Sequence, residues 1–384
     1  MIRLKTTCKT LVNILGIAIP NIFIFLMSAS CNCDSKYYNP DVLKIIKKQD
    51  RSTLLVPKTI GTIDNGDILG LCNTDKYLIV ITNTSGQFIR VYDMATDSLI
   101  ASFGEFGNAA NEFEDYISHY YVYNDPEGNA LLYVTDCKGI LTKVIDIEKS
   151  LECGGCVLRK TYKHPVELSG LESRNYYIDN DYIVYYKEVS FVDPRDNLFN
   201  PPTFGVLKSG THTVQQIFPN IISNDCINVI LGAYSIKSCI SPRITHIVGV
   251  MKFIDIITIV DLSTLNTTGL MDDASYDFYF LENQVNRENL TSKLRLYNLD
   301  ICAAKECFFV LKECGKTIDE LSEKRRDSSS IKYLYAYSWD GEIIDSFMMS
   351  EELLRITYND SSRRLYGADE NGKLFKYDIP ITTI

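Results

Sequence analysis

The sequence predicts an all-β fold, a six-bladed β-propeller made of four-stranded antiparallel blades. Three observations lead to this prediction. A hairpin pattern recurs six times, its spacing suits four strands in each repeat, and a strand-like run near the N-terminus lacks a repeat of its own. In each hairpin an apolar run is followed by a polar turn and a second apolar run, most often ending at or near an aspartate.

The last hairpin shows the pattern most clearly. Arg364–Ala368 and Leu374–Tyr377 flank a turn that contains Glu-Asn-Gly, residues typical of tight hairpin turns. Three of the five hairpins upstream have short turns and two have long ones. The paired runs are Tyr77–Ile81 with Phe88–Tyr92, Leu131–Thr135 with Leu141–Ile145, Tyr182–Tyr186 with Thr203–Leu207, His246–Val250 with Ile256–Val260, and Cys307–Leu311 with Tyr333–Tyr337.

The spacing of the hairpins indicates the size of the repeat. The positions that follow the second strand are separated by 53, 62, 53, 77 and 40 residues, and they are Asp93, Asp146, Lys208, Asp261, Ser338 and Asp378. Four strands of about five or six residues with their turns fill such a period, as in a propeller blade. Ser98–Phe103, Thr213–Phe218 and Glu342–Phe347 fit the place of a fourth strand. A pair of β-sandwiches is the alternative, but it does not account for six related hairpins.

The last blade lacks room for its own outer strand, because only Ile379–Ile384 follows its hairpin. The run Thr53–Ile60 precedes the first repeat and has no blade. We therefore expect this run to supply the outer strand of the last blade, so that both chain ends fasten the ring. Such closure would remove an exposed sheet edge, which otherwise invites aggregation.

Residues 1–30 have the features of an export signal. A basic start with Arg3, Lys5 and Lys9 precedes the mostly apolar segment Leu11–Met27. We expect residues 31–51 to form a tether and residues 52–384 to form one propeller domain, since no Pro/Gly/Ser-rich linker divides the repeats.

The end of this signal, Met27-Ser-Ala-Ser-Cys31, resembles the lipobox of bacterial lipoproteins, although Ser28 replaces the usual Leu-like residue. In that family, signal peptidase II cleaves before a cysteine that carries diacylglycerol. The resemblance implies a lipid anchor at Cys31 and a location in the cell envelope, in the periplasm or at the outer-membrane surface. A lipid anchor attaches a protein to the membrane without spanning it. Plain secretion and an uncleaved anchor are the alternatives.

The net charge argues against a nucleic-acid partner. The whole chain carries 39 basic and 49 acidic residues, a formal charge of −10. Without residues 1–30 the balance is 36 basic against 49 acidic, or −13. Such a surface repels phosphate backbones.

The segment Gly104–Phe113 follows the first expected outer strand and has the pattern GxxGxxxxEF. Gly104, Gly107, Glu112 and Phe113 match the Gly-rich GxxGxGPGEF stretch of the TolB-like six-bladed propeller lipoproteins of Bacteroidota, which this chain resembles. The resemblance implies fold and compartment and no reaction. Physically, glycines allow a tight crossing between blades. The loop is interpreted as one that shapes blade packing, with a ligand loop as the alternative.

Two hairpins carry insertions. Val192–Pro202 is expected to be an irregular loop, and Gly315–Ser330 is long enough for a helical turn or two at Ile318–Lys324. In a propeller both lie on the face that carries the connections between blades. Long loops are often functional, so this face is the candidate binding face, with tolerated surface insertions as the alternative. Its candidate residues are Asp193, Arg195, Asp196, Glu320, Arg325 and Arg326.

Known catalytic and metal-binding motifs are absent from the sequence. None of the four histidines (His119, His164, His212 and His246) belongs to an HExxH motif, and no GxSxG, Walker or GxGxxG motif occurs. We expect no cofactor and no metal. Cys153-Gly-Gly-Cys156 is the one CxxC among twelve cysteines; a zinc or redox role, a local disulfide and free thiols all stay open.

These observations favour a non-catalytic binding or scaffolding module at the cell envelope, whose partner is an envelope protein or an extracellular ligand. The alternative is a propeller-type lyase or hydrolase with a site at the central channel. His119 together with carboxylates in the channel would favour the enzyme. Tyrosines cluster at Tyr116–Tyr123 and Tyr176–Tyr186, where they suit strands or could stack on sugar rings at a pocket mouth.

Overall fold

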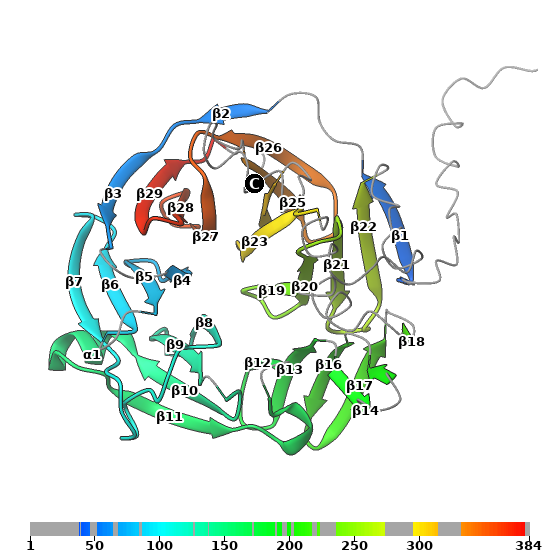
Figure 1. Ribbon diagram of the computed structural model, residues 1–384, viewed down its shortest axis with the longest axis horizontal. Helices are drawn as coiled ribbons and strands as arrows, with labels where there is room; N and C mark the ends of the chain where they lie inside the picture. Colours follow the sequence, from blue (N-terminus) through cyan, green and yellow to red (C-terminus); the bar gives the residue numbers. More distant parts are fainter. Residues whose placement is uncertain are drawn as a thin grey trace, which may run out of the picture. The chain divides into compact units, whose positions relative to one another are not determined.

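The chain forms a six-bladed β-propeller (Figure 1), with each blade built on a four-stranded antiparallel sheet; in two blades a further, parallel strand lies at the outer edge. The computed structural model describes residues 38, 40–46, 52–63, 68–83, 87–125, 127–136, 138–170, 173–188, 190–193, 198–200, 203–216, 221–222, 236–272, 295–313 and 332–380. No helix in these ranges is both long and apolar enough to cross a membrane.

Each blade runs from an inner strand at the centre to an outer strand at the rim (Figure 1). Blade 1 is β4 (Ile68–Asn73), β5 (Tyr77–Thr82), β6 (Ile89–Asp93) and β7 (Ser98–Phe103); blade 2 is β8 (His119–Asn124), β9 (Ala130–Thr135), β10 (Leu141–Asp146) and β11 (Leu158–Lys163). Blade 3 is β12 (Ser173–Tyr177), β13 (Tyr182–Lys187), β16 (Thr203–Lys208) and β17 (Thr211–Gln216); blade 4 is β19 (Ile236–Ile240), β20 (His246–Met251), β21 (Ile256–Asp261) and β22 (Thr267–Asp272). Blade 5 is β23 (Asn298–Ala303), β24 (Cys307–Lys312), β25 (Lys332–Ser338) and β26 (Ile343–Met349); blade 6 is β27 (Leu353–Asn359), β28 (Arg364–Asp369), β29 (Lys373–Asp378) and β3 (Lys58–Thr62).

All six expected hairpins are present as the second and third strands of their blades. Their frequent terminal aspartate has a local cause, because it caps the turn that follows. Asp93 Oδ1 accepts hydrogen bonds from the backbone N–H groups of Ala95 and Thr96 at 2.9 and 2.8 Å. Asp261 Oδ1 does the same for the two N–H groups that follow Leu262. A short acidic side chain is suited to such turns.

The N-terminal run differs from the expected single strand Thr53–Ile60. It forms β2 (Thr53–Leu55), which pairs parallel with β26 of blade 5, and β3, which pairs antiparallel with β29 of blade 6. Pro57 lies between the two strands and has no N–H group to donate to a sheet. The run is therefore divided between two neighbouring blades.

Part of the expected tether is packed on the propeller instead. β1 (Val42–Ile46) pairs parallel with β22 as a fifth strand of blade 4. Tyr38 is buried between blades 3 and 4, and its hydroxyl lies 2.8 Å from Thr258 Oγ1. The apolar Val-Leu-Lys-Ile-Ile run explains the strand, and Lys44 pairs with Glu342 at 2.6 Å. The expected Lys-rich tether thus contains an edge strand.

The insertion in blade 3 is also more regular than expected. β14 (Ser190–Asp193) and β15 (Leu198–Asn200) pair antiparallel, and β18 (Ile221–Ile222) extends this small sheet. The adjacent apolar residues Phe191 and Val192 in β14, and Leu198 and Phe199 in β15, suit these two short strands. The insertion Gly315–Ser330, with the turns expected at Ile318–Lys324, lies outside the described residues.

The core consists of six apolar clusters, one between each pair of neighbouring blades. Blades 1 and 2 share a cluster, and so do 2 and 3, 3 and 4, 4 and 5, and 5 and 6. The sixth joins blade 6 to blade 1, where Tyr366 and Leu374 pack with Leu78 and Val80. Second and third strands are apolar on both faces because each face packs against a different neighbour.

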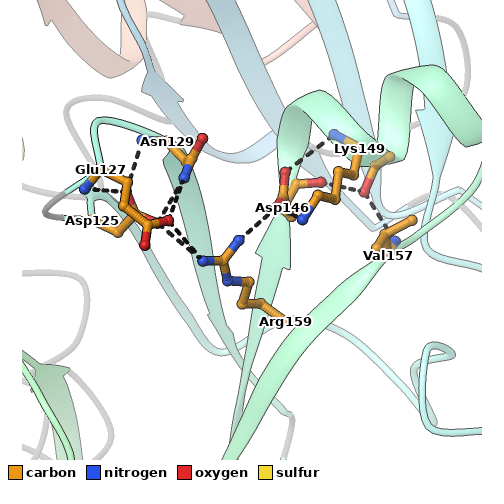
Figure 2. A network of polar contacts seen from close by, with 8 residues as sticks. Asp125, Glu127, Asn129, Asp146, Lys149, Val157 and Arg159 are labelled. Atoms are coloured by element: carbon orange, nitrogen blue, oxygen red, sulfur yellow. Dashed lines mark hydrogen bonds and ion pairs between the residues drawn. The ribbon is translucent and has the colours of Figure 1, made fainter.

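Blade 2 contains the helix α1 (Ile147–Cys153), which the sequence pattern did not predict. Figure 2 shows the polar network beside it. Asp146 caps the helix by accepting from the N–H of Lys149 at 3.1 Å, and its other oxygen lies 3.4 Å from Arg159. Arg159 also reaches Glu127 at 3.3 Å and Asp125 at 3.5 Å. These contacts connect the turn between β8 and β9 to the start of α1 and to the outer strand β11.

Asp97 links blade 1 to blade 6. It occupies the turn between β6 and β7 with a φ of 59°, and its carboxylate lies 2.6 Å from Lys376 Nζ in β29 and 3.2 Å from Lys58 Nζ in β3. Burial acts to raise the pKa of Asp97, but the hydrogen bonds from the two lysines outweigh it and hold the pKa below its ordinary value.

We expect Asp97→Asn to lower the free energy of unfolding by about 1–3 kcal/mol at neutral pH, because two lysines lose a charged partner. Asn tolerates the left-handed backbone, so the turn survives. A carboxyl with a depressed folded pKa stabilises the fold above its unfolded pKa, and this stabilisation is lost as the pH falls through the folded pKa. Urea unfolding should therefore show a difference between wild type and variant at pH 7 that narrows at pH 3. Glu148→Gln, which alters an exposed ion pair with Lys76, should change little; an equal effect would contradict the prediction.

Candidate functional site

The inner strands of all six blades line one central cavity of about 1010 Å³. These strands are β4, β8, β12, β19, β23 and β27, which surround the centre of the ring in Figure 1. Their side chains cannot pack against another sheet at the centre, so polar and apolar groups alternate along the wall. This cavity is the candidate functional site.

Charged side chains gather at the end of the cavity where the inner strands begin. Arg174 and Lys237 are the second residues of β12 and β19, while Asp300 and Arg355 are the third residues of β23 and β27. Lys252 directly follows β20, whose last residue pairs with the first residue of β19. The connections between blades and the turns between second and third strands lie at this same end. We call it the insertion face.

Two ion pairs neutralise part of this charge. Arg174 lies 3.3 Å from Glu188, the residue after β13. Lys237 Nζ lies 3.1 Å from Asp300 Oδ1, and Asp300 Oδ2 accepts a hydrogen bond from the backbone N–H of Ile356 at 2.8 Å. Burial lowers the pKa of Lys237, and its pairing with Asp300 only partly opposes this. The second pair ties blade 4 to blades 5 and 6.

Two further cations have no carboxylate partner among the described residues. Arg355 donates from Nε to the carbonyl oxygen of Leu69 at 2.7 Å and from a terminal nitrogen to that of Leu354 at 2.9 Å. Lys252 is exposed, with Nζ 5.1 Å from the ring centroid of Phe253. Although the residue as a whole is exposed, partial desolvation of its ammonium by the surrounding wall lowers the pKa of Lys252, and the positive charge of Arg355 lowers it further. We call Arg174, Lys237, Lys252 and Arg355 the cationic mouth.

His119 lies in the cavity wall beside tyrosines. Its ring is buried, with centroids 4.8 Å from Tyr176 and 5.6 Å from Tyr121. Burial lowers the pKa of His119 well below its ordinary value, and the positive charge of Arg174 adds to this effect. The imidazole is therefore neutral at physiological pH, and its Nε2 has no hydrogen-bond partner among the described residues.

The tyrosine clusters divide between wall and core. Five tyrosines of these clusters line the cavity, as does Tyr358 of β27; the five are Tyr116, Tyr120, Tyr121, Tyr123 and Tyr176. Tyr177, Tyr185 and Tyr186 instead pack between blades. Tyr120 lies across Gly70 of the neighbouring inner strand, where an added Cβ would come within 1.8 Å of the phenol ring. Gly70 therefore lets Tyr120 reach the cavity wall.

The candidate binding residues from the insertions are largely outside the described part of the chain. Asp193 ends β14, and of it only the backbone is described. Arg195, Asp196, Glu320, Arg325 and Arg326 lie outside the described residues, as does Cys31. Their role stays a prediction.

The sequence analysis did not predict the cationic mouth, because it located the hairpins and not the inner strands. A signal was present: aligning the strand before each hairpin places a charged residue second or third in four of the six blades. A charge near the start of a strand that must face the centre of the ring marks the cavity wall.

The Gly104–Phe113 loop has a structural explanation. Gly104 has a φ of 85°, and its carbonyl oxygen accepts from the N–H of Phe88 at 3.1 Å. Glu112 folds back to accept from the N–H of Ala109 at 2.8 Å, and a Cβ on Gly107 would lie only 2.0 Å from its carboxylate. Phe113 is buried between blades 1 and 2. Gly104, Gly107 and Glu112 thus set the compact shape of the loop, and Phe113 anchors it in the core between blades 1 and 2.

In the part of the chain that the structure describes, the other histidines and the cysteines have individual structural surroundings. His164 is buried, with Nε2 2.8 Å from Thr142 Oγ1, and His246 stacks on Trp339 at 5.7 Å between ring centroids. Within the described ranges, no three His, Cys, Asp or Glu side chains are placed to hold a metal ion. The described cysteines, including the pair Cys153 and Cys156, are free thiols.

Comparison with known proteins bears on the fold. No family model matches the sequence, and no curated protein matches it. A structure from Bacteroides fragilis NCTC 9343, of a protein thought to be exported, is similar with 11% identity and a TM-score of 0.52, covering 87% of this chain and 98% of that chain. A member of the DUF4221 family from Bacteroides vulgatus ATCC 8482 has 12% identity and a TM-score of 0.51, with 87% and 97% covered. At such identities the likeness shows a shared fold.

The pair between Lys237 and Asp300 gives a direct test of the site geometry. We expect Asp300→Asn to lower the free energy of unfolding by about 1–3 kcal/mol, because Lys237 loses its counter-ion inside the wall. The amide oxygen can still accept from Ile356, so the ring should stay folded. Asp378→Asn, which alters an ion pair with Arg364 whose carboxylate is 87% exposed, is the control and should have little effect. Equal urea midpoints for Asp300→Asn and wild type would show that the pair is not formed.

Proposed function

We propose that this protein is a non-catalytic binding module of the bacterial cell envelope, and that its ligand occupies the central cavity. The observation that carries the proposal is the cavity of about 1010 Å³, which all six blades line. Its volume is at the upper end of the range for small-molecule sites. Its wall is built on strands held by packing between blades, so the site is formed before a ligand arrives.

The insertion face supports this proposal by its position. The turn from β13 to β16 and the turn from β24 to β25 both emerge beside the start of the inner strands, where the cationic mouth lies. The strands that flank the two insertions thus end and begin at this end of the cavity. We propose that the partner bound at this face is an envelope protein or an extracellular ligand.

The proposed location is supported by the N-terminal sequence and by one similar structure. The segment before Cys31 resembles a lipobox, and one of the similar structures is of a protein thought to be exported. The TolB-like lipoproteins, which share the Gly104–Phe113 pattern, are the family we favour. We propose lipid anchoring at Cys31, in the periplasm or at the outer-membrane surface.

A lyase or hydrolase acting at the channel is the second candidate, and one observation favours it. His119, Asp300 and Glu188 all line the cavity, and a neutral imidazole can act as a base. Both carboxylates, however, are paired with cations, and His119 contacts tyrosines. We therefore favour the binding module over the enzyme.

A blocked cavity tests the proposed function. Protein purified from its own envelope should release a non-metal small molecule on denaturation, detected by mass spectrometry. We expect Leu354→Trp to lose this molecule, because Leu354 lines the cavity and the larger ring fills it. Leu99→Trp, on the exposed side of β7, should retain it. A bound metal with substrate turnover, and no released ligand, would favour the enzyme.

A second test concerns the anchor. We expect Cys31→Ser to prevent lipid attachment and to move the protein from the membrane pellet to the soluble envelope fraction. Mass spectrometry of the mature N-terminus should show the diacylglycerol mass on Cys31 in wild type and its absence in the variant. Cys33→Ser is the neighbouring control and should stay in the pellet. An unmodified Cys31 in wild type would contradict lipid anchoring.

A further inference from the structure

We propose that the cationic mouth binds a small ligand through a doubly negative group, a phosphate monoester or a pair of carboxylates. This inference rests on the proposed function, because it names the chemistry of the ligand in the same cavity. It follows from the charge balance of the mouth, from the N–H groups of Lys252 and Arg355 that remain available to a ligand, and from the position of the mouth in the cavity.

The charge balance of the mouth is +2. Four cations line this end of the cavity, and two described carboxylates face them. Glu188 pairs with Arg174 and Asp300 pairs with Lys237. Four positive charges less two negative charges leave Lys252 and Arg355 without a counter-ion at this end of the cavity, in the part of the chain that the structure describes. The two other carboxylates of the wall, Asp75 and Asp360, follow the ends of β4 and β27 and so line the opposite end. An occupant with two negative charges would complete the balance.

The repulsion between these cations is a cost of the arrangement. Lys237, Lys252 and Arg355 line the same end of one cavity, and the positive charge of Arg355 accordingly acts to lower the pKa of both lysines. Like charges in a partly enclosed site oppose each other more strongly than in water. Packing alone gives no reason to gather them, whereas an anion between them would remove the cost.

The two unpaired cations keep donors for such an anion. Arg355 uses Nε and one terminal N–H for carbonyl oxygens, and a guanidinium has five N–H groups. The ammonium of Lys252 has three N–H groups, and the contact that the structure describes for it is the one with the ring of Phe253, which leaves these donors available. An arginine and a lysine together suit a tetrahedral phosphate or two carboxylates.

The surroundings favour a small organic anion over a polymer. The chain as a whole carries −10, so a polyanion would be repelled outside the mouth, whereas the local positive field draws a small anion in. Beyond the mouth, Tyr121 and Ile178 line the wall. These side chains suit the uncharged remainder of an organic molecule.

The test is calorimetric titration of the full-length protein, purified in detergent at low ionic strength, with inorganic phosphate and with succinate. Glucose is the neutral control and sodium chloride the ionic control. We expect one or both dianions to bind and neither control to do so. A preference for phosphate points to a phosphate monoester, and a preference for succinate points to a dicarboxylate. Failure of both dianions to bind would overturn the inference.

Two variants make the result specific. Lys252→Met should weaken dianion binding about 10-fold, the loss of a charge-assisted hydrogen bond, and Lys252→Arg should restore most of it. Lys208→Met is the matched control: Lys208 is exposed, lies 5.2 Å from the ring of Tyr182, and is outside the cavity. Equal affinities for Lys252→Met and Lys208→Met would contradict the proposal.

Asp300→Asn provides a test of opposite sign. Removing this carboxylate raises the charge of the mouth from +2 to +3, so dianion affinity should increase about 3- to 10-fold. A gain in affinity cannot arise from misfolding, whereas weaker binding in this variant would count against the electrostatic argument.

The same experiments separate this inference from the proposed function. A neutral ligand that co-purifies, is lost in Leu354→Trp and is retained in Lys252→Met would overturn the dianion and leave the binding module intact. Absence of any cavity ligand, with no dianion bound, would overturn both.

Discussion

The face-to-face packing of neighbouring blades is the constraint on which the rest of the structure depends. A strand such as β24 is buried along its whole length, so its sheet must have an apolar partner on each side. No blade can meet this need alone, and six clusters meet it around the ring. The cluster between blades 6 and 1 removes the last uncovered apolar face. Asp97 adds an ionic link across the same junction, where two blades distant in sequence meet.

The central cavity follows from this packing. Blades that pack side by side around a ring cannot also pack at its axis, so the inner strands keep one edge that faces an open centre. Charged side chains are tolerated there because they are not forced into an apolar interface. Arg174, Lys237 and Arg355 therefore lie near the starts of their strands. In β12 and β27, Tyr177 and Leu353 are instead buried between blades and do not line the cavity. The fold separates structural residues from cavity residues within a single strand.

This separation explains which parts of the molecule the sequence could predict. Second and third strands read as continuous apolar runs because both faces are buried, and so all six hairpins were located correctly. Inner strands mix core and cavity residues, so their pattern is weak and Lys237 or Arg355 gave no clear signal. The N-terminal segment was misjudged for a different reason. β1 is one short run among lysines, and its place is set by contacts such as Tyr38 with Thr258, which are distant in sequence. Pro57 divides the run Thr53–Ile60 between two strands, although its hydropathy pattern predicts a single strand.

Buried lysines elsewhere in the protein show how this fold accommodates a cation for structural reasons, and the mouth differs from them in a way that favours a binding role. Where a lysine is buried for packing, the chain supplies a partner: Lys312 pairs with Asp255 and Lys332 with Glu313, while Lys143 donates to a carbonyl oxygen and lies over Phe113. At the mouth the chain does the opposite, because it brings Arg355 near Lys252 and Lys237 and provides one carboxylate, Asp300, for the three. Repelling groups held on a rigid wall destabilise the empty site and stabilise an occupied one. A site with that property is preorganised for a negative ligand, and rigidity of the inner strands is what prevents the cations from moving apart.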